Sequence, residues 1–197
     1  MLKTSPTLLH RRSALTLLAA VAWPVLVRAD ESAKEPFREP AALLRIGACV
    51  VLLRHATTVP GIGDPPHFKL GDCRTQRNLS DVGQQESRRL GAWFAAQQLQ
   101  PRAVLSSAWC RCKDTAQLAF GQHTVWPALN SSFRDRISQP AQTEVVRQAL
   151  SRIPAQQFEV WVTHQVNISA ITGQGPAMGE GFILDRQGQV MSRMAFA

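Results

Sequence analysis

The sequence predicts an α/β fold, a three-layer sandwich whose largely parallel central sheet carries helices on both faces. Strand-like apolar runs alternate along the chain with segments of helical periodicity, which is the order that successive β-α-β units produce. The first run, residues 49–54, stays apolar up to Arg54, as a strand covered on both faces requires. The length of 197 residues suits one domain with a sizeable core.

Residues 1–29 have the layout of a secretory signal peptide and are not expected to join this fold. A basic stretch with Arg11 and Arg12 precedes an apolar run over residues 13–27, and cleavage is predicted after Ala29. The run is short for a membrane span, which needs about 20 residues, so an uncleaved anchor is the weaker alternative. The paired arginines leave twin-arginine export open beside the general route. We therefore expect a periplasmic or secreted protein with no stable membrane insertion after cleavage.

Removal of this segment changes the interpretation of the net charge. The whole chain has 22 basic and 14 acidic residues and a formal charge of +8, which is high enough to suggest nucleic acid as a partner. Cleavage leaves 18 basic residues against the same 14 acidic ones, a charge of +4. No dense Lys/Arg block or alternation of basic and aromatic residues remains, so nucleic-acid binding is not expected. The remaining charge mildly favours an anionic small substrate and does not identify one.

The first part of the mature chain contains little regular structure outside the first strand. Residues 30–45 are polar and contain two prolines, so we expect a flexible lead-in to a domain of residues 46–197. Residues 59–78 are rich in proline and glycine and predict a long loop directly after the first strand. Loops of this length are often functional, and this one is expected to face the substrate.

Three side chains of this loop are candidates for contact with a bound anion. Arg74 and Arg77 either reach such an anion or are solvated, and the pattern does not distinguish the two. For His67 we favour the solvated interpretation.

The remaining elements follow in regular alternation. Ser80 or Asp81 is the expected N-cap of the first long helix, and Pro101 is expected to end it. We expect helices over about residues 80–98, 108–120 and 142–153 and again from about residue 167, strands over 103–107, 124–126 and 158–163, a polar loop over 128–140, and a closing hairpin over 181–191.

Cationic and imidazole side chains follow three of the predicted strands. Arg54 and His55 end the first, Arg111 lies in the first turn of the helix after the second, and His164 ends the fourth. The carboxyl ends of parallel strands meet at one edge of a sheet, which is where ligands bind in such folds. Guanidinium groups match tetrahedral oxyanions, and a helix N-terminus adds free N–H groups. These residues predict a phosphate site.

Two other kinds of site fit these residues less well. Two imidazoles without a carboxylate partner, flanked by permanent cations, would repel a divalent ion, so neither a metal nor another cofactor is expected. Ser106 and Ser107 at the end of the second strand lack the Gly-x-Ser-x-Gly pattern of a serine nucleophile. Capping of the following helix is the preferred role for this pair.

Four short motifs resemble, in order, signatures of the histidine phosphatase superfamily, phosphoglycerate mutase-like branch. The resemblance covers about residues 48–185 and implies the phosphoglycerate mutase-like form of the α/β sandwich. It implies that His55 is the nucleophile and His164 a second catalytic residue, while Arg54, Thr58 and Arg111 bind the substrate. The motifs are LRHATT (residues 53–58), NLSDVGQQ (78–85), SSAWCRCKDTA (106–116) and VTH (162–164).

The general acid that this family uses to protonate the leaving oxygen has no obvious counterpart. Members with Asp directly after the second His have Gln165 at that position here, and members with Glu after the third strand have only Asn130 or Asp135. Glu180 is the preferred candidate and Asp135 the alternative. With no acid, good leaving groups such as phosphoanhydrides, acyl phosphates or phosphoramidates would be favoured, since general acid catalysis contributes about 10²–10⁴-fold.

The cysteines lie in the mature chain, where export favours disulfide formation. We expect one bridge from Cys73 in the long loop to Cys110 or Cys112, which would fasten the loop beside Arg111. Cys49, at the start of a buried strand, is expected to stay a thiol.

These patterns together predict an exported phosphatase, a phosphoric monoester hydrolase of the histidine phosphatase type. It would hydrolyse phosphomonoesters or phosphoanhydrides through a phosphohistidine on His55. A catalytically weak protein of the cell envelope that binds a phosphorylated ligand is the alternative. A mutase is a weaker option, because exported compartments rarely supply the phosphorylated metabolites that prime mutases.

Overall fold

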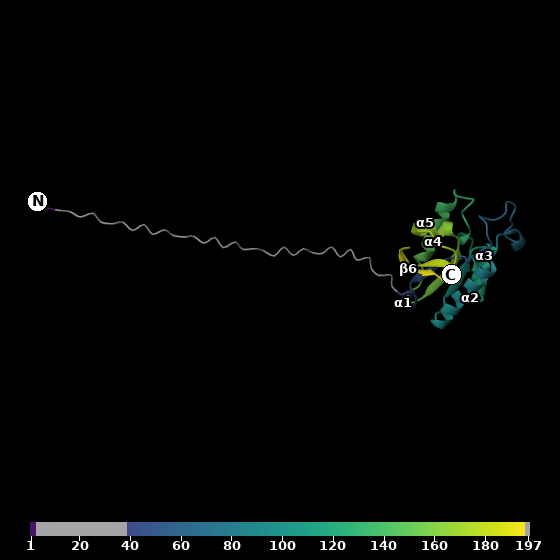
Figure 1. Ribbon diagram of the computed structural model, residues 1–197, viewed down its shortest axis with the longest axis horizontal. Coiled ribbons are helices and arrows are strands. Elements are labelled where there is room, and N and C mark those ends of the chain that lie inside the picture. The colour runs from purple at the N-terminus through teal and green to yellow at the C-terminus, as the bar shows by residue number, and fades with distance from the viewer. Residues whose placement is uncertain (3–38, 196–197) are drawn as a thin grey trace. The chain divides into compact units, whose positions relative to one another are not determined.

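The computed structural model describes residues 1–2 and 39–195, so the predicted cleavage site lies outside the described residues. Residues 39–195 form a six-stranded sheet with five α-helices packed against its two faces (Figure 1). The predicted α/β fold class is therefore confirmed. Within this described part, no helix is both long and apolar enough to cross a membrane.

The strands lie in the order β3-β2-β4-β1-β5-β6 across the sheet. The first four are mutually parallel, whereas β5 and β6 form the predicted closing hairpin and run antiparallel to their neighbours. The carboxyl ends of β1, β2 and β4 consequently meet at one edge. The strands span Cys49–Arg54 (β1), Ala103–Ser106 (β2), Thr124–Val125 (β3), Phe158–Thr163 (β4), Glu180–Asp185 (β5) and Val190–Ala195 (β6).

The two central strands, β1 and β4, pair residue for residue in parallel register. Arg54 lies opposite Thr163, and the backbone N–H of His55 extends the ladder by donating to the carbonyl of Thr163 at 3.1 Å. The residues that follow the two strands, His55 and His164, therefore emerge beside each other.

Each face of the sheet has its own apolar core. Leu53 belongs to the core under α1, α2 and α3, together with Phe94. Leu52 faces the opposite side and belongs to the core under α4 and α5, together with Leu150. The apolar run of β1 is thus buried on both sides, as predicted. The helices span Pro40–Ile46 (α1), Asp81–Ala96 (α2), Cys110–Phe120 (α3), Gln139–Leu150 (α4) and Gln165–Thr172 (α5), with short 3₁₀ turns at Cys73–Thr75 and Pro127–Leu129.

Helix α2 begins where the sequence predicts, with Ser80 as its N-cap. The Ser80 hydroxyl accepts a hydrogen bond from the backbone N–H of Gly83 at 3.2 Å. Gly83 also touches the backbone of the segment after β1, because a Cβ at this position would lie 1.9 Å from the carbonyl oxygen of Thr57. The glycine therefore allows α2 to pack directly against the chain that follows His55.

The prediction of a flexible lead-in is wrong from Pro40 onward, where α1 begins. Proline suits the first turn of a helix, and the carboxylate of Glu39 accepts the backbone N–H of Ala42 at 3.2 Å. The short helix buries Leu43 and Leu44 in the first core. The folded domain therefore begins before residue 46.

Several other helix boundaries differ from the prediction by two or three residues, among them the end of α4 at Leu150 and the start of α5 at Gln165. Helix α4 begins at Gln139, because Pro140 occupies its first turn. Helix α2 ends at Ala96, ahead of Pro101, and α3 begins at Cys110 with Trp109 as its N-cap. Since the N-cap of α3 is Trp109, the predicted capping role of Ser106 and Ser107 is wrong.

The contact at Gly83 predicts a large effect of a single methyl group. We expect Gly83→Ala to lower the free energy of unfolding by about 1–3 kcal/mol, because the new Cβ must displace either α2 or the Thr57 backbone. Urea unfolding measures this loss. Gly71→Ala is the matched control, since a Cβ there meets nothing within 4 Å. Equal stability of the two variants would contradict the close packing at Gly83.

Candidate active site

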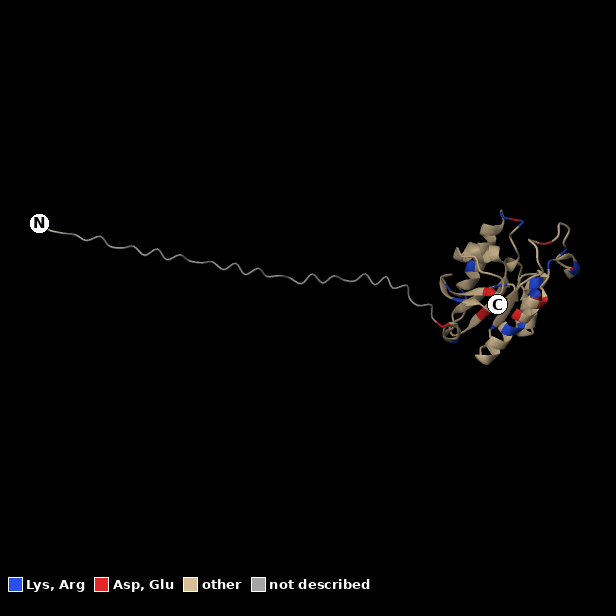
Figure 2. Ribbon diagram, in the orientation of Figure 1, with Lys and Arg blue, Asp and Glu red and all other residues tan. Residues whose placement is uncertain are grey.

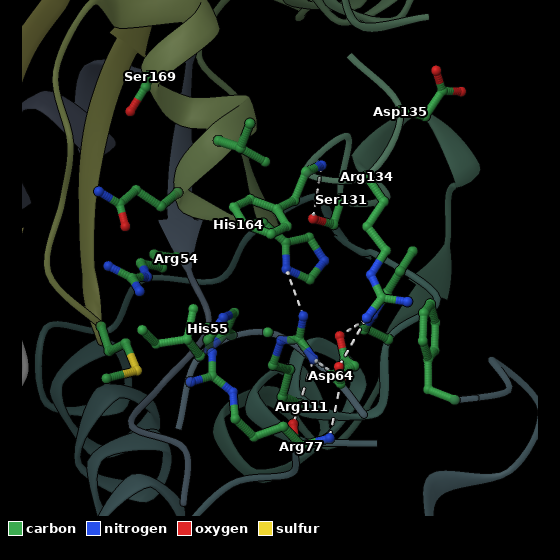
Figure 3. Close-up of a pocket in the computed structure, with 18 of the residues that line it drawn as sticks. Arg54, His55, Asp64, Arg77, Arg111, Ser131, Arg134, Asp135, His164 and Ser169 are labelled. Carbon is green, nitrogen blue, oxygen red and sulfur yellow. Dashed lines mark hydrogen bonds and ion pairs between the residues drawn. The ribbon is translucent and has the colours of Figure 1, made fainter. Parts of the chain in front are cut away.

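The strand ends and the long loop enclose one cavity of about 880 Å³. Arg54, His55 and His164 come from the ends of β1 and β4, and Arg111 comes from the first turn of α3 (Figure 3). Arg77 from the long loop also lines this cavity. The structure therefore brings together four of the residues predicted from the strand ends and adds Arg77, which the sequence left undecided.

The His55 ring is buried and held in one orientation by a backbone contact. Its Nδ1 lies 2.9 Å from the carbonyl oxygen of Ala56, which can only accept a hydrogen bond, so Nδ1 carries the proton. Nε2 therefore carries the lone pair. Burial and the positive charge of Arg111 lower the pKa of His55 to about 3, although the Ala56 carbonyl acts in the opposite direction. The ring is neutral at physiological pH, as a nucleophile must be.

His164 lies across from His55, with its ring centroid 5.5 Å away. Its Nε2 lies 2.8 Å from the hydroxyl of Ser107, and its Nδ1 lies 3.5 Å from Arg111 Nη2. Because the guanidinium can only donate, Nδ1 accepts and Nε2 donates to Ser107, whose hydroxyl in turn lies 3.3 Å from Asn130 Oδ1. Burial first, and then His55 and Arg111, hold the pKa of His164 well below its usual range. Ser107 thus orients the second imidazole.

Arg111 forms a buried ion pair with Asp64 in the long loop. The Nη1–Oδ1 distance is 2.7 Å, and the two side chains are only 5% and 7% exposed. Asp64 also accepts hydrogen bonds from Trp109 Nε1 at 3.0 Å and from the backbone N–H of Arg77 at 3.0 Å. Burial alone would raise the pKa of Asp64, but these three donors and the charge of Arg111 lower it. Asp64 is therefore an ionised carboxylate that fixes Arg111.

Asp64 is the site residue that the sequence prediction missed. It lies in a Gly/Pro-rich loop and belongs to none of the four motifs. Electrostatics could have indicated Asp64 as a site residue. Arginines that converge on one site need a carboxylate, and the long loop contains only Asp64 and Asp72.

The inner part of the cavity has excess positive charge and unsatisfied N–H donors. Arg54, Arg77 and Arg111 line this part, and Asp64, paired with Arg111, is the one carboxylate of the described residues that lines it with them, which leaves two positive charges beside two neutral imidazoles. The Nε atom of each arginine is buried and has no hydrogen-bond partner among the described residues. Elsewhere in the domain, basic and acidic residues are interspersed (Figure 2). A dianion such as phosphate would balance this local charge and accept these donors.

The comparison with known families agrees with this geometry. A profile of the histidine phosphatase superfamily (branch 1) matches residues 50–165. The chain belongs to the histidine phosphatase superfamily. This membership supports a phosphatase function, and it confirms the resemblance seen in the sequence motifs. No curated protein sequence matches the chain significantly.

Solved structures of this superfamily share the fold at low sequence identity. SixA from Agrobacterium tumefaciens superposes with a TM-score of 0.52 at 19% identity, over 75% of this chain and 98% of that chain. The protein histidine phosphatase SixA in complex with tungstate gives a TM-score of 0.52 at 17% identity, over 75% and 97%. A phosphoglycerate mutase from Thermus thermophilus gives 0.53 at 20%, over 75% and 98%. These similarities confirm the predicted phosphoglycerate mutase-like fold.

Three other predicted candidates do not line the cavity. Thr58 is buried and its hydroxyl donates to the sulfur of Met178 at 3.6 Å, so it supports the cavity wall from behind. Arg74 is exposed and paired with Asp72. His67 is also exposed, in agreement with the solvated interpretation.

The predicted general acid, Glu180, is not part of the site. It begins β5, and its carboxylate accepts hydrogen bonds from Arg193 at 2.5 Å and from the backbone N–H of Ala177 at 2.6 Å. Burial would raise its pKa, but Arg193 and Ala177 lower it, so the carboxylate is ionised. It does not line the cavity. The prediction fails because Arg193, across the β5–β6 hairpin, holds this carboxylate ionised in an ion pair.

The alternative acid, Asp135, lies at the outer rim of the cavity. Its carboxylate accepts hydrogen bonds from the hydroxyl and the backbone N–H of Ser138, which lower its pKa. Figure 3 shows this carboxylate directed away from His55. Asp135 is therefore ionised and turned away from the reacting centre.

A disulfide joins Cys73 to Cys110, with the Cα atoms 5.7 Å apart. This is one of the two pairings expected from the sequence. It fastens the long loop to the start of α3, next to Arg111. Cys49 and Cys112 are buried thiols, as expected for Cys49, and burial raises the pKa of each to about 12.

Loss of the buried Arg111–Asp64 pair should affect stability differently from loss of the exposed Arg74–Asp72 pair in the same loop. Asp64→Asn leaves Arg111 as an uncompensated buried charge, so we expect a loss of about 3–5 kcal/mol in unfolding free energy. Inorganic phosphate should restore part of this loss by supplying negative charge. Asp72→Asn removes the partner of exposed Arg74 and should change the stability far less. Thermal unfolding of the two variants, with and without phosphate, measures these changes. Equal losses of stability in Asp64→Asn and Asp72→Asn would contradict the structural role of Asp64.

The lowered pKa of His55 predicts a specific acid sensitivity. In the unfolded chain a histidine takes up a proton near pH 6.5, whereas folded His55 stays neutral down to about pH 3. Between these values the unfolded state binds more protons, so stability falls as the pH falls, by up to about 1.4 kcal/mol per pH unit.

We expect His55→Asn to reduce this slope in urea unfolding measured from pH 6.5 to 4.5 without phosphate. His67→Asn, at an exposed position, controls for the loss of one histidine. An unchanged slope in the His55 variant would contradict a neutral, buried nucleophile.

Proposed function

We propose that this protein is an exported phosphatase that hydrolyses small phosphomonoesters or phosphoanhydrides through a phosphohistidine on His55. One observation carries the proposal: Nδ1 of His55 is bound to the Ala56 carbonyl, so the lone pair of Nε2 is available in a cavity whose inner part is lined by Arg54, Arg77 and Arg111. Export rests on the signal-like sequence of residues 1–29.

The first step is attack of His55 Nε2 on the phosphorus atom. The nitrogen–phosphorus bond forms while the bond to the leaving oxygen breaks, and its electron pair stays on that oxygen. Arg54 and Arg111 stabilise the negative charge on the phosphoryl oxygens, and His164 accepts from Arg111 through Nδ1 and so orients that guanidinium. Because the Asp64 pair and the sheet hold these groups in advance, little reorganisation is needed.

The second step is attack of water on the phosphohistidine. The phosphorus–nitrogen bond breaks, its electron pair returns to Nε2, and the proton released by water leaves with the product or solvent. The positive charges that lower the pKa of His55 also make the neutral imidazole a good leaving group in this step.

A phosphate-binding protein with weak turnover is the second candidate. It is favoured by a specific observation, namely that neither Glu180 nor Asp135 is arranged to protonate a leaving oxygen. The two functions share the same cavity and differ in whether a phosphoenzyme forms.

Trapping of the phosphoenzyme distinguishes them. We expect the mature protein to hydrolyse 4-nitrophenyl phosphate equally well with and without chelator, since protein cations carry the phosphate. Alkaline quenching followed by intact mass spectrometry should detect one added phosphoryl group. His55→Ala should abolish this adduct and lower kcat by several orders of magnitude.

His67→Ala, in the same loop but exposed, should behave as the unchanged protein. Equal turnover in the His55→Ala variant would rule out the nucleophile assignment. Stabilisation by phosphate without any turnover in the unchanged protein would favour the binding function instead.

A further inference from the structure

The outer part of the same cavity carries a second pair of cations. Arg134 and Arg136 line it from the segment between β3 and α4, opposite the long loop. We call these two residues the outer arginines. They follow Phe133, an exposed aromatic residue that also lines the cavity.

Arg134 is fixed directly beside the inner phosphate site. Its Nη2 donates to the carbonyl oxygen of Asp64 at 2.9 Å, and its guanidinium lies 5.1 Å from the ring centroid of Phe68. Asp64 in turn binds Arg111, so Arg134 of the outer pair and Arg111 of the inner site both contact the same loop residue. In Figure 3 the Arg134 side chain extends from its own loop towards Asp64.

The charge of the outer arginines is not balanced by the carboxylate between them. Asp135 is directed away from His55 and is bound to Ser138. Arg136 makes no hydrogen bond or ion pair with any residue that the structure describes, and it is exposed. The outer wall therefore presents positive charge to whatever extends from the phosphoryl group.

The cavity also lacks a carboxylic acid that could protonate a leaving oxygen. Asp64 and Asp135 are the only carboxylates among the described residues that line it. Asp64 is bound to Arg111, Trp109 and the Arg77 backbone, and Asp135 is bound to Ser138. The leaving group must therefore depart as an anion.

These two observations select one kind of leaving group. An alkoxide is strongly basic and needs a proton, whereas a phosphate monoester loses its last proton near pH 6 and departs as a stable dianion. The outer arginines would stabilise that charge as it develops, in place of a general acid. The outer arginines would stabilise an imidazole or aryl leaving group less.

We propose that the substrate is an organic diphosphate, whose terminal phosphoryl group passes to His55 and whose inner phosphate leaves against the outer arginines. This rests on the proposed phosphatase function. The bond from the bridging oxygen to the terminal phosphorus breaks and its electron pair stays on that oxygen. Water then hydrolyses the phosphohistidine, so one diphosphate and one water give an organic monophosphate, inorganic phosphate and one proton.

Three probes test this substrate class on the mature protein in chelator: hexyl diphosphate, hexyl phosphate and 4-nitrophenyl phosphate. The two hexyl compounds share an alkyl group and differ in the leaving group. We expect kcat/KM for hexyl diphosphate to exceed that for hexyl phosphate by at least about 10²-fold, the usual contribution of a general acid that the diphosphate does not need.

The role of the outer arginines is tested by the ratio of kcat/KM for hexyl diphosphate to that for 4-nitrophenyl phosphate. Arg136→Ala should lower this ratio about tenfold, which corresponds to about 1.4 kcal/mol, and Arg136→Lys should lower it less. Arg89→Ala, which removes an equal charge from an exposed position of α2 outside the cavity, should leave the ratio unchanged. Arg134→Ala should also lower the ratio, and thermal unfolding of this variant reports whether loss of its loop contacts contributes.

The outcomes distinguish failure of the diphosphate proposal from failure of the phosphatase function. Turnover of 4-nitrophenyl phosphate with no preference for the diphosphate over hexyl phosphate overturns the diphosphate proposal and leaves the phosphatase in place. The same is true if the ratio is unchanged in both Arg136→Ala and Arg134→Ala. Absence of turnover and of a phosphoenzyme with all three probes overturns the phosphatase function itself.

Discussion

The register between β1 and β4 is the constraint on which the site depends. With Arg54 paired to Thr163, the two histidines leave the sheet at the same level, and their rings lie 5.5 Å apart. A shift by one residue would turn alternate side chains of a strand to the opposite face, moving Leu53 out of one core and Leu52 out of the other. The close packing of the two cores around β1 holds this register, and the register places the imidazoles. Fold stability and site geometry have the same physical origin here.

Electrostatic repulsion is the cost of this arrangement, and the long loop offsets it. Arg54, Arg77 and Arg111 are crowded at one edge, where burial lowers the pKa of Arg54 and Arg77 as well as that of His55. The carboxylate of Asp64 neutralises one of these charges, and the disulfide holds its loop to α3. Burial first, and then the uncompensated cations, keep both imidazoles neutral, and these cations leave a charge that matches a phosphate dianion. The same field therefore tunes the nucleophile and attracts the substrate.

The sequence predicts the structural features that local residue patterns determine. It does not predict those that depend on contacts between distant segments of the chain. The apolar run before Arg54 and the strand before His164 are local, and so the fold class and most of the inner site could be predicted. Asp64 could not be found in this way, because its burial depends on how a loop without periodicity packs against α3. Glu180 was chosen for its position in the chain, yet an ion pair with Arg193 across a hairpin determines where its carboxylate points. The segment Pro40–Ile46 likewise becomes helical through the core contacts that Leu43 and Leu44 make.

The division between sheet and loops also explains how chemistry and selectivity are separated. The sheet supplies the histidines, and most of the wall beyond them comes from two loops that Arg134 connects by donating to the Asp64 carbonyl. A change in either loop would alter which substituent on the phosphoryl group the cavity accepts, without moving His55. Because Asp64 contacts Arg111 through its carboxylate and Arg134 through its carbonyl, it couples the two regions. Under the proposed function, substrate selectivity resides mainly in segments that the four sequence motifs leave undefined, and Asp64 is the residue through which those segments contact Arg111.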